Sequence, residues 1–375
     1  MYFGKIYNIE TKLKQAAEVA VETVLAVKPG ERAIIITNPG KEVHAVSLAL
    51  YDAISKQGGE PVLICQPVKT QVNYADPSVY QALRTNPEIV ISMTHEKMGK
   101  DKYGLENGYE ADGIKWNNYF HYLLHGVKKV RAFWSPSVTQ EIFINTVLVD
   151  YEKMKKEVAL VGAVLDNAEK IHIISPLGTD LSLGVSGRKA FIDDGDFTKA
   201  GRGGNLPAGE AFVSPELDTA NGVIVFDGSI SLDSGDIAIS EPICAEVENG
   251  FVTAIHGGEE AEKLRNSLLK GKEEAMKLEA SGKFSPEEAQ QYARNARNIG
   301  ELGIGLNPNA KIQGNMLVDE KAYKTCHVAI GANYDKDAPA LIHLDGLITE
   351  PTISAQLPEG MHTVILDKGD LILSD

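Results

Sequence analysis

The chain lacks most features that mark secreted, membrane-spanning or disulfide-rich proteins. It has only three cysteines, Cys65, Cys244 and Cys326, which are too few for a disulfide framework and include no C-x-x-C pair. No run of about 18 apolar residues is present to form a transmembrane helix. The N-terminal MYFGKIYNIETKLKQ has no apolar core of the kind found in signal peptides. We therefore expect a cytoplasmic protein whose cysteines are small buried residues.

Positive charge is also scarce. The 37 lysines and arginines are outnumbered by 52 aspartates and glutamates, which gives a formal net charge of −15. Nucleic acids and anionic lipids attract basic surfaces, so this composition argues against both as partners. The 43% of hydrophobic and 24% of charged residues are typical of a folded globular chain. An enzyme acting on small molecules or peptides fits this composition, as does an acidic cluster that binds cations.

The first 165 residues alternate between helical and strand patterns. Apolar residues recur at helical spacing over 10–28 and 41–58. Short apolar runs between or after the helices are the expected strands, at 33–36, 61–65, 89–93 and 129–134. This alternation predicts an α/β domain with a mostly parallel sheet at 1–165. The polar, glycine-containing stretch 96–118 is expected to be a long loop, either a lid or a surface insertion.

After residue 165 the pattern becomes rich in strands. Residues 243–255 predict a hairpin with an Asn249-Gly250 turn, and a charged amphipathic helix is expected at 259–281. Ser285-Pro286-Glu287-Glu288 is a capping box that begins another helix. Strand-like segments near residues 301, 327, 343 and 364 follow. We predict a β-rich α+β domain at 166–375, and a chain of 375 residues accommodates these two domains.

Two of these segments carry possible metal ligands. His343 and Asp345 are two residues apart, so in a strand they lie on the same face and form a chelating pair. His327, Ala329 and Gly331 likewise share one face, which is otherwise small and leaves room in front of the imidazole. Each segment taken alone has an ordinary explanation, as a surface or a buried structural histidine.

Carboxylates with similar surroundings come earlier in the chain. Glu301 shares a strand face with Gly303 and Gly305, and glycines within strands often mark the close approach of a ligand or of another backbone. Glu210 follows a turn rich in Asn, Pro and Gly. Two Glu, two His and one Asp without a thiolate fit Zn, Mn, Co or Fe(II). Five such ligands suffice for two ions about 3.5–4 Å apart.

Four strings carry a specific resemblance: GNLPAGEAFVSPE…ANGVIVFDGSI, ELGIGLNP, DEKAYKTCHVAIG and IHLDGLI. Over about 205–348 they resemble, in order, the aminopeptidase T/aminopeptidase S family of metallopeptidases (leucyl aminopeptidase-like, thermophilic metalloprotease type). The resemblance implies a homodimer and a metal-binding C-terminal domain. It also implies a pair of divalent ions, Zn, Co or Mn, held by Glu210, Glu301, His327, His343 and Asp345. It further suggests Tyr334, Glu301 and Glu320 as catalytic residues, although the two histidines are closer in sequence than in the family.

The main functional prediction is therefore a metalloaminopeptidase that removes N-terminal residues from small peptides with a metal-bridged water. Glu301 or Glu320 would transfer the proton, and Tyr334 would donate a hydrogen bond to the oxyanion. The alternative uses His327, His343 and Asp345 as a non-heme Fe(II) triad. Ring-cleaving 2,5-dihydroxypyridine dioxygenases resemble the same scaffold. A third reading is a binding protein that has kept a metal fold.

Three other motifs are interpreted as structural. His121 and His125 have helical i,i+4 spacing but no glutamate between them, so they do not match a zincin and are expected to be structural or lid residues. Residues 193–196 (DDGD) lack the later glutamate of a calcium loop and are expected to be a solvated turn. The glycines of 201–204 are not followed by the Lys-Ser/Thr of a phosphate-binding loop.

Overall fold

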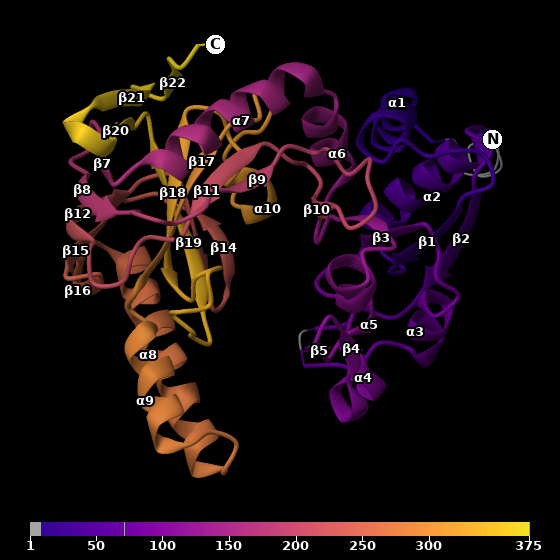
Figure 1. Cartoon of the computed structure of the whole chain (residues 1–375), viewed down its shortest axis with the longest axis horizontal. Coiled ribbons are helices and arrows are strands. Elements are labelled where there is room, and N and C mark those ends of the chain that lie inside the picture. Colours follow the sequence, from indigo (N-terminus) through magenta and orange to yellow (C-terminus); the bar gives the residue numbers. More distant parts are fainter. Residues whose placement is uncertain (1–8, 71, 375) are drawn as a thin grey trace. The chain divides into compact units, whose positions relative to one another are not determined.

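The computed structural model describes residues 9–70 and 72–374 and divides the chain into two compact units (Figure 1). The first comprises Met1–Tyr151 with Gly195–Ala208, and the second Glu152–Asp194 with Gly209–Asp375. The predicted division into 1–165 and 166–375 stays a prediction. Among the described helices, none combines the length and apolarity needed to cross a membrane.

The first unit is built on a five-stranded parallel sheet with the order β10-β6-β3-β1-β2. Its strands are β1 (Arg32–Thr37), β2 (Glu60–Cys65), β3 (Ile89–Met93), β6 (Arg131–Trp134) and β10 (Gly203–Asn205). β1 reads RAIIIT and is buried along nearly all its length, as expected where both faces of a parallel sheet are covered. The predicted α/β architecture with a mostly parallel sheet is confirmed.

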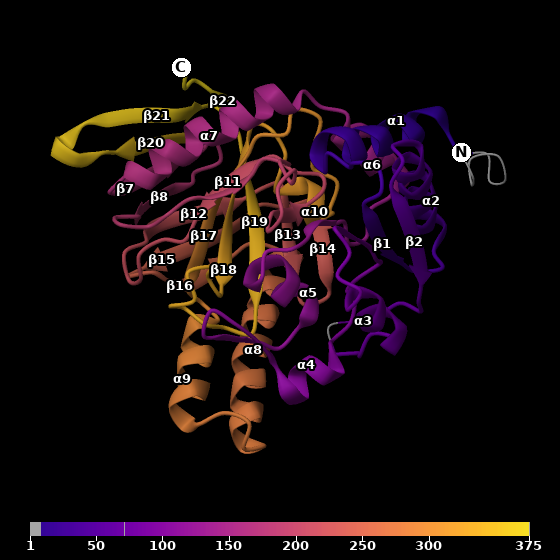
Figure 2. The same ribbon diagram turned by 45° about the vertical axis from the view of Figure 1, so that its right-hand side comes forward.

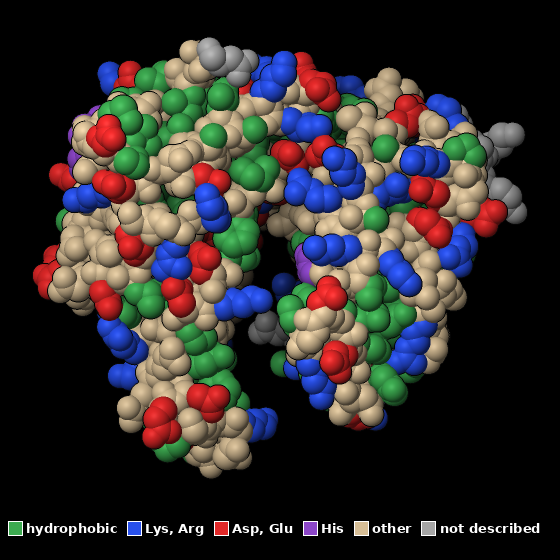
Figure 3. Space-filling model, in the orientation of Figure 1, with side chains coloured by type: hydrophobic (Ala, Val, Ile, Leu, Met, Phe, Trp, Pro, Cys, Tyr) green, Lys and Arg blue, Asp and Glu red, His purple; other side chains and the backbone are tan. Residues whose placement is uncertain are grey.

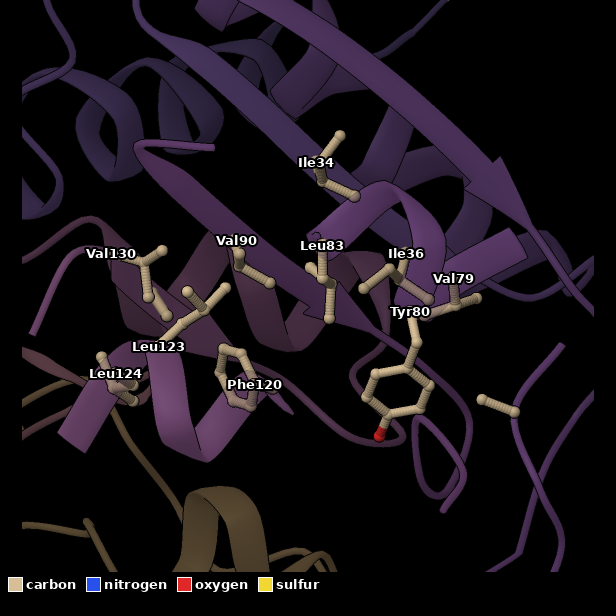
Figure 4. Close-up of a cluster of buried hydrophobic side chains, with 12 residues drawn as sticks. Ile34, Ile36, Val79, Tyr80, Leu83, Val90, Phe120, Leu123, Leu124 and Val130 are labelled. Atoms are coloured by element: carbon tan, nitrogen blue, oxygen red, sulfur yellow. The ribbon is translucent and has the colours of Figure 1, made fainter. Parts of the chain in front are cut away.

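Helices supply the apolar side chains that cover this sheet. They are α1 (Thr11–Val19), continued by the π-helical η1 (Ala20–Val24), α2 (Lys41–Lys56), α3 (Pro77–Leu83), α5 (Tyr119–His121), continued by the π-helical η2 (Tyr122–Gly126), and α6 (Gln140–Val147). Figure 4 shows side chains of α3, α5 and η2 packed against Ile34 and Ile36 of β1 and Val90 of β3. Ile34 and Ile36 point to the same face because side chains alternate along a strand.

The segment 96–118 has its own secondary structure, so the prediction of a plain long loop was wrong there. It contains α4 (Lys102–Asn107) and a hairpin of β4 (Tyr109–Ala111) and β5 (Ile114–Trp116). Asp101 organises it, because its carboxylate accepts hydrogen bonds from the Gly104 N–H and the Tyr109 hydroxyl, both at 2.9 Å. Such side-chain caps let a polar segment satisfy its backbone without an apolar pattern.

The second unit contains two antiparallel sheets. The seven-stranded sheet has the order β14 (Gly235–Ala238), β13 (Ser229–Leu232), β19 (His343–Thr349), β18 (Thr325–Gly331), β17 (Ile299–Gly305), β11 (Glu210–Val213), β9 (Phe191–Asp193). The eight-stranded sheet has the order β16 (Phe251–His256), β15 (Ile243–Glu248), β12 (Asn221–Phe226), β8 (Asp180–Gly184), β7 (Lys170–Ile174), β20 (Thr352–Gln356), β21 (His362–Asp367), β22 (Asp370–Leu371). The predicted β-rich C-terminal half is confirmed.

The helices of this unit are α7 (Tyr151–Asn167, whose first residue belongs to the first unit), α8 (Glu259–Ala280), α9 (Pro286–Asn295), α10 (Met316–Asp319) and the 3₁₀ turn η3 (Pro358–Gly360). α8 and α9 pack together and extend away from the sheets of their own unit (Figure 2). Ser285 caps α9 in the expected capping box. The β15–β16 hairpin turns at Asn249 and Gly250, both with positive φ, as a type I′ turn requires. Figure 3 shows acidic and basic side chains interspersed on the visible face of each unit.

Candidate metal centre

Three neighbouring strands of the seven-stranded sheet bring four of the predicted ligands together. In the strand register, Glu301 of β17 and Asp345 of β19 both lie opposite Ala329 of β18. His327 lies opposite Gly303, and His343 opposite Gly331. Directly paired residues share a face of an antiparallel sheet, so all four side chains project from the same side. The two-residue periodicity seen in the sequence is therefore the feature that places them.

The four side chains meet at short distances. His327 Nε2 lies 3.2 Å from Glu301 Oε1, and His343 Nε2 lies 3.3 Å from Glu301 Oε2 and 3.2 Å from Asp345 Oδ1. Two ligand atoms that each lie about 2.1 Å from one cation are separated by about 3.0–3.4 Å. The side chains are therefore spaced as ligands of one ion are.

Gly303 provides the space for His327. A Cβ atom on Gly303 would lie 2.1 Å from both Cε1 and Nε2 of the imidazole. Any other residue would displace the ring, because such contacts are far inside van der Waals distance. The glycine that the sequence marked as a point of close approach thus accommodates a candidate ligand.

His343 is oriented by a backbone group. Its Nδ1–H donates a hydrogen bond to the carbonyl of Ala332 at 2.8 Å. A fixed Nδ1–H leaves Nε2 to face the cluster, where a neutral imidazole can offer its lone pair to a metal. Metal-binding histidines commonly have such a partner on the second ring nitrogen.

Several buried polar atoms of the cluster have no hydrogen-bond partner within the described residues. They are Glu210 Oε2, Glu301 Oε2, His327 Nδ1 and Asp345 Oδ1. Glu301 Oε2 and Asp345 Oδ1 have only the ion-pair contact with His343 Nε2, and a cation would satisfy the carboxylate oxygens more fully. Buried imidazoles and carboxylates are also the donors that divalent first-row metals bind. The residues present therefore fit a metal ion.

The pKa values of the cluster also indicate that its buried carboxylates need nearby positive charge. Burial alone would lower the pKa of His327, but its hydrogen bond with Glu301 and the charge of Glu210 outweigh burial and raise this pKa to about 9. Burial would raise the pKa of Asp345, but the charge of His343 outweighs it and lowers this pKa to about 2. Protonated imidazoles balance the carboxylates in the metal-free chain, and a bound cation would replace those protons.

Glu210 and Glu320 lie around a different cation. Lys321 is completely buried, and its Nζ contacts Glu210 Oε1 at 2.5 Å, Glu320 Oε1 at 2.7 Å and Asp193 Oδ2 at 3.2 Å. Glu210 still borders the first cluster, because its Oε2 lies 3.7 Å from His327 Nε2. Glu210, Glu320 and His327 could hold a second ion by their geometry alone, but the ammonium already lies among the carboxylates.

Sequence reasoning missed Lys321 and misread Asp193. A lysine after Glu320 looks like any surface lysine, and no periodicity marks it for burial. Asp193 was expected in a solvated turn, but it ends β9, is 8% exposed and pairs with Lys321. The acids at the ends of neighbouring strands were the signal that could have indicated a buried lysine, because several buried carboxylates require a buried counter-charge.

Tyr334 lies beside the cluster within an aromatic group. Its ring contacts His343 edge-on at 5.4 Å between centroids, Phe212 at 5.0 Å and Phe191 at 5.7 Å. Phe191 and Phe212 are stacked, with centroids 5.0 Å apart and an angle of 10° between the rings. The catalytic and metal-binding roles assigned to the predicted site residues stay predictions, while their proximity is a feature of the fold.

Comparison with known proteins corrects the functional prediction. The family model NicX, described as 2,5-dihydroxypyridine 5,6-dioxygenase, matches residues 139–333, just over half of the chain. A curated protein of the same description from Pseudomonas putida KT2440 is 35% identical over 123 residues. That match covers 31% of this chain and 33% of the relative, so it spans about a third of the relative's length.

Two solved structures share the fold. The 2,5-dihydroxypyridine dioxygenase of P. putida KT2440 matches with a TM-score of 0.67 and 18% identity, covering 97% of both chains. AmpT from Thermus thermophilus matches with a TM-score of 0.63 and 19% identity, covering 96% of this chain and 99% of that chain. The resemblance to aminopeptidase T thus holds for the fold.

The prediction of a hydrolase, a metalloaminopeptidase, was wrong, and the family match overturns it in favour of the alternative. The physical reason is that imidazoles and carboxylates on these strands serve either chemistry, so ligand types alone could not separate them. The sequence match that names a family extends over β9, β11, β17 and β18. The chain belongs to the 2,5-dihydroxypyridine 5,6-dioxygenase family, NicX.

Proposed function

We propose that this chain is a ring-cleaving dioxygenase that uses one ferrous ion, held by His327, His343 and Asp345, to open an electron-rich hydroxylated pyridine ring. The observation that carries the proposal is the cluster of two imidazoles and a carboxylate, which is the donor set of non-heme Fe(II) oxygenases. Iron held in this way supplies the redox chemistry through which dioxygen reacts with an electron-rich ring. One O2 is consumed for each ring, and both of its oxygen atoms enter the product.

The burial of Lys321 supports one metal rather than the predicted pair. Its ammonium supplies positive charge to Glu210 and Glu320, which a second ion would otherwise bind. The other four side chains, the imidazoles of His327 and His343 and the carboxylates of Glu301 and Asp345, then surround one possible metal position. We propose iron at that position in place of the Zn, Co or Mn pair.

Glu301 is suited to move a proton. Its carboxylate lies between the two imidazoles and is buried, with 3% of the residue exposed. A ring hydroxyl must lose its proton to become a good electron donor, and a carboxylate within hydrogen-bond reach can accept that proton. We propose Glu301 as this base. Glu320, which the sequence suggested for proton transfer, is instead proposed to pair with Lys321.

The aromatic group beside His343 supports a planar substrate. Phe191, Phe212 and Tyr334 form a wall in which the Tyr334 side chain is half exposed. Aromatic side chains stack on planar rings with offset or edge-on geometry. We propose that this wall holds the substrate ring, with Tyr334 as a stacking residue. A homodimer in the cytoplasm, acting on a small molecule, remains our expectation for the assembly and its location.

The test is oxygen uptake by the iron-loaded protein. The full chain, loaded with Fe(II) without oxygen and then given 2,5-dihydroxypyridine and O2, should consume one O2 per ring as the ring absorbance disappears. Asp345→Ala should lose both bound iron and activity. His256→Ala is the matched control, because His256 is exposed and pairs with Glu246 on the other sheet. An iron-loaded protein that takes up no oxygen with any dihydroxypyridine would overturn the proposal.

A further inference from the structure

The first unit contains a cavity that belongs to none of the chemistry above. Its volume is about 380 Å³, and all its lining residues lie in the first unit. Ser92 and Thr94 come from the end of β3 and the residues after it, and Trp134 and Pro136 from the end of β6 and beyond. The cavity therefore opens at the carboxyl ends of two adjacent parallel strands.

This edge is where open α/β sheets bind ligands. The chain passes from β1 to β2 on one side and then returns to place β3 on the other side of β1. Ligand sites of doubly wound sheets lie at the carboxyl ends of the strands, most often at such a reversal; here the reversal is between β1 and β3, and the cavity lies beside it at β3 and β6. The volume is also within the range of about 300–1,000 Å³ found for small-molecule sites.

Two hydroxyl side chains in the lining lack partners. Ser92 is 7% exposed and Thr94 is 2% exposed, and neither side chain has a hydrogen-bond partner within the described residues. Their backbone carbonyls are used, because they accept from the N–H groups of Ser135 and Ser137. Nearly buried hydroxyls that border a cavity and lack protein partners are suited to bind a polar group of a ligand.

The wall of the cavity is aromatic and its rim is basic. Phe120 and Trp134 meet edge-on with centroids 6.0 Å apart, and Phe120 also belongs to the buried cluster of Figure 4, which holds it in place. Lys97 and Lys100 line the cavity, and neither has a carboxylate partner within the described residues. Glu96 contributes one opposing charge, which leaves the rim net positive.

We propose that this cavity is a binding site for a planar aromatic anion, with its ring against Phe120 and Trp134 and its charged group near Lys97 and Lys100. The hydroxyls of Ser92 and Thr94 bind the polar atoms of that ligand. Every residue that lines this cavity belongs to the first unit, and none of them is a residue of the metal cluster.

Tryptophan fluorescence gives a direct test. The chain has two tryptophans, so Trp116→Phe leaves Trp134 as the only indole, and this indole lines the cavity. We expect benzoate to change the Trp134 emission saturably in the metal-free full chain. Benzamide, which has the same shape without the charge, should bind about tenfold more weakly, since a charge-assisted contact contributes about one factor of ten.

Variants separate this site from nonspecific binding. The double change Lys97→Met and Lys100→Met should weaken benzoate binding about tenfold and leave benzamide binding unchanged. Thr94→Val should weaken both ligands. Lys272→Met is the matched control, because this lysine lies on α8 in the second unit, and it should change neither.

Two outcomes would overturn the proposal. One is the absence of any saturable change up to about 10 mM benzoate. The other is loss of benzoate binding in His343→Ala, since that result would place the probe at the metal cluster. Unchanged benzoate binding in His343→Ala, together with lost oxygen uptake, would support both the cavity and the proposed function as separate properties.

Discussion

Lys321 allows a sharp test of the metal centre. Replacing it with methionine keeps much of the side-chain length but removes the charge that faces Glu210, Glu320 and Asp193. Removing one partner from a buried ion pair costs about 3–5 kcal/mol, because the remaining charges stay buried without compensation. Burial raises the pKa of Glu210 to about 8 even against the opposing charge of Lys321, so this acid is largely protonated near neutral pH and the loss falls at the lower end of that range. We therefore expect about 3 kcal/mol at neutral pH.

This loss converts into a measurable shift in melting temperature. The second unit has about 210 residues, and for that size 1 kcal/mol changes Tm by about 2–4 °C. Lys321→Met should therefore melt about 6–12 °C below the wild type when both are metal-free. Lys270→Met is the matched control, since Lys270 is 58% exposed at its side chain and pairs with Asp233 at 2.7 Å. An exposed pair contributes about 0–1 kcal/mol, so this control should shift Tm little.

The same variant should change the number of bound metals. Without the ammonium, the carboxylates of Glu210 and Glu320 lose their counter-charge and can bind a cation of their own, beside the ion that we propose at His327, His343 and Asp345. We expect one metal per chain in the wild type and two in Lys321→Met, with Mn²⁺ recovering part of the lost Tm because a ligand of the native state stabilises it. Elemental analysis after dialysis measures both proteins. Two tightly bound ions in the wild type would refute the reasoning, as would a Lys321→Met protein with unchanged stability.

Three further predictions test the neighbouring groups. Gly303→Ala places a Cβ 2.1 Å from the His327 ring, so bound metal measured by elemental analysis should fall well below that of the wild type, while an unchanged content would contradict this role. Because the pKa of His327 is about 9 and that of His343 is also raised above its usual value near 6.5, protons compete with metal below pH 9. Metal affinity measured by calorimetry should therefore rise from pH 6 to 9, with protons released on binding. In the metal-free chain, the stability contributed by these imidazolium ions is fully present below about pH 6.5 and is lost as the pH rises through about 9. Phe212→Leu removes the stacked wall beside Tyr334, so the KM for the ring should rise about 2–12-fold, as expected for an aromatic contact of about 0.5–1.5 kcal/mol, while iron content stays constant.

The parts of the fold with a regular apolar pattern could be predicted from the sequence. β1, β2, β3 and β6 are short apolar runs between helices, and their parallel pairing follows from that alternation. β10 was missed because Gly203, Gly204 and Asn205 carry no apolar side chain, and pairing with β6 alone makes them a strand. The segment 96–118 was missed for a similar reason, since Asp101 rather than an apolar face organises it.

For the site, the sequence could predict which residues of one strand share a face, because side chains alternate along a strand. His343 and Asp345 share a face on any strand, and the same rule applies to Glu301 with Gly303. Which strands are neighbours depends on register, and register depends on packing that one sequence does not display. Lys321 shows the limit most clearly, because burial of a lysine contradicts the ordinary preference of that residue and requires three acids from separate segments.

The charge of Lys321 argues against a second metal ion in this chain. A second divalent ion on the free oxygen of Glu210 would lie about 4 Å from the ammonium of Lys321, and at an effective dielectric constant of about 20 the two would repel by about 8 kcal/mol. Glu320 and Asp193 offset part of that repulsion, but they are already paired with the same ammonium. The acids that resemble ligands of a second metal are therefore better explained as partners of an internal cation. His327, His343 and Asp345 then remain as the donors that we propose for a single ion, with Glu301 beside them as the proposed base.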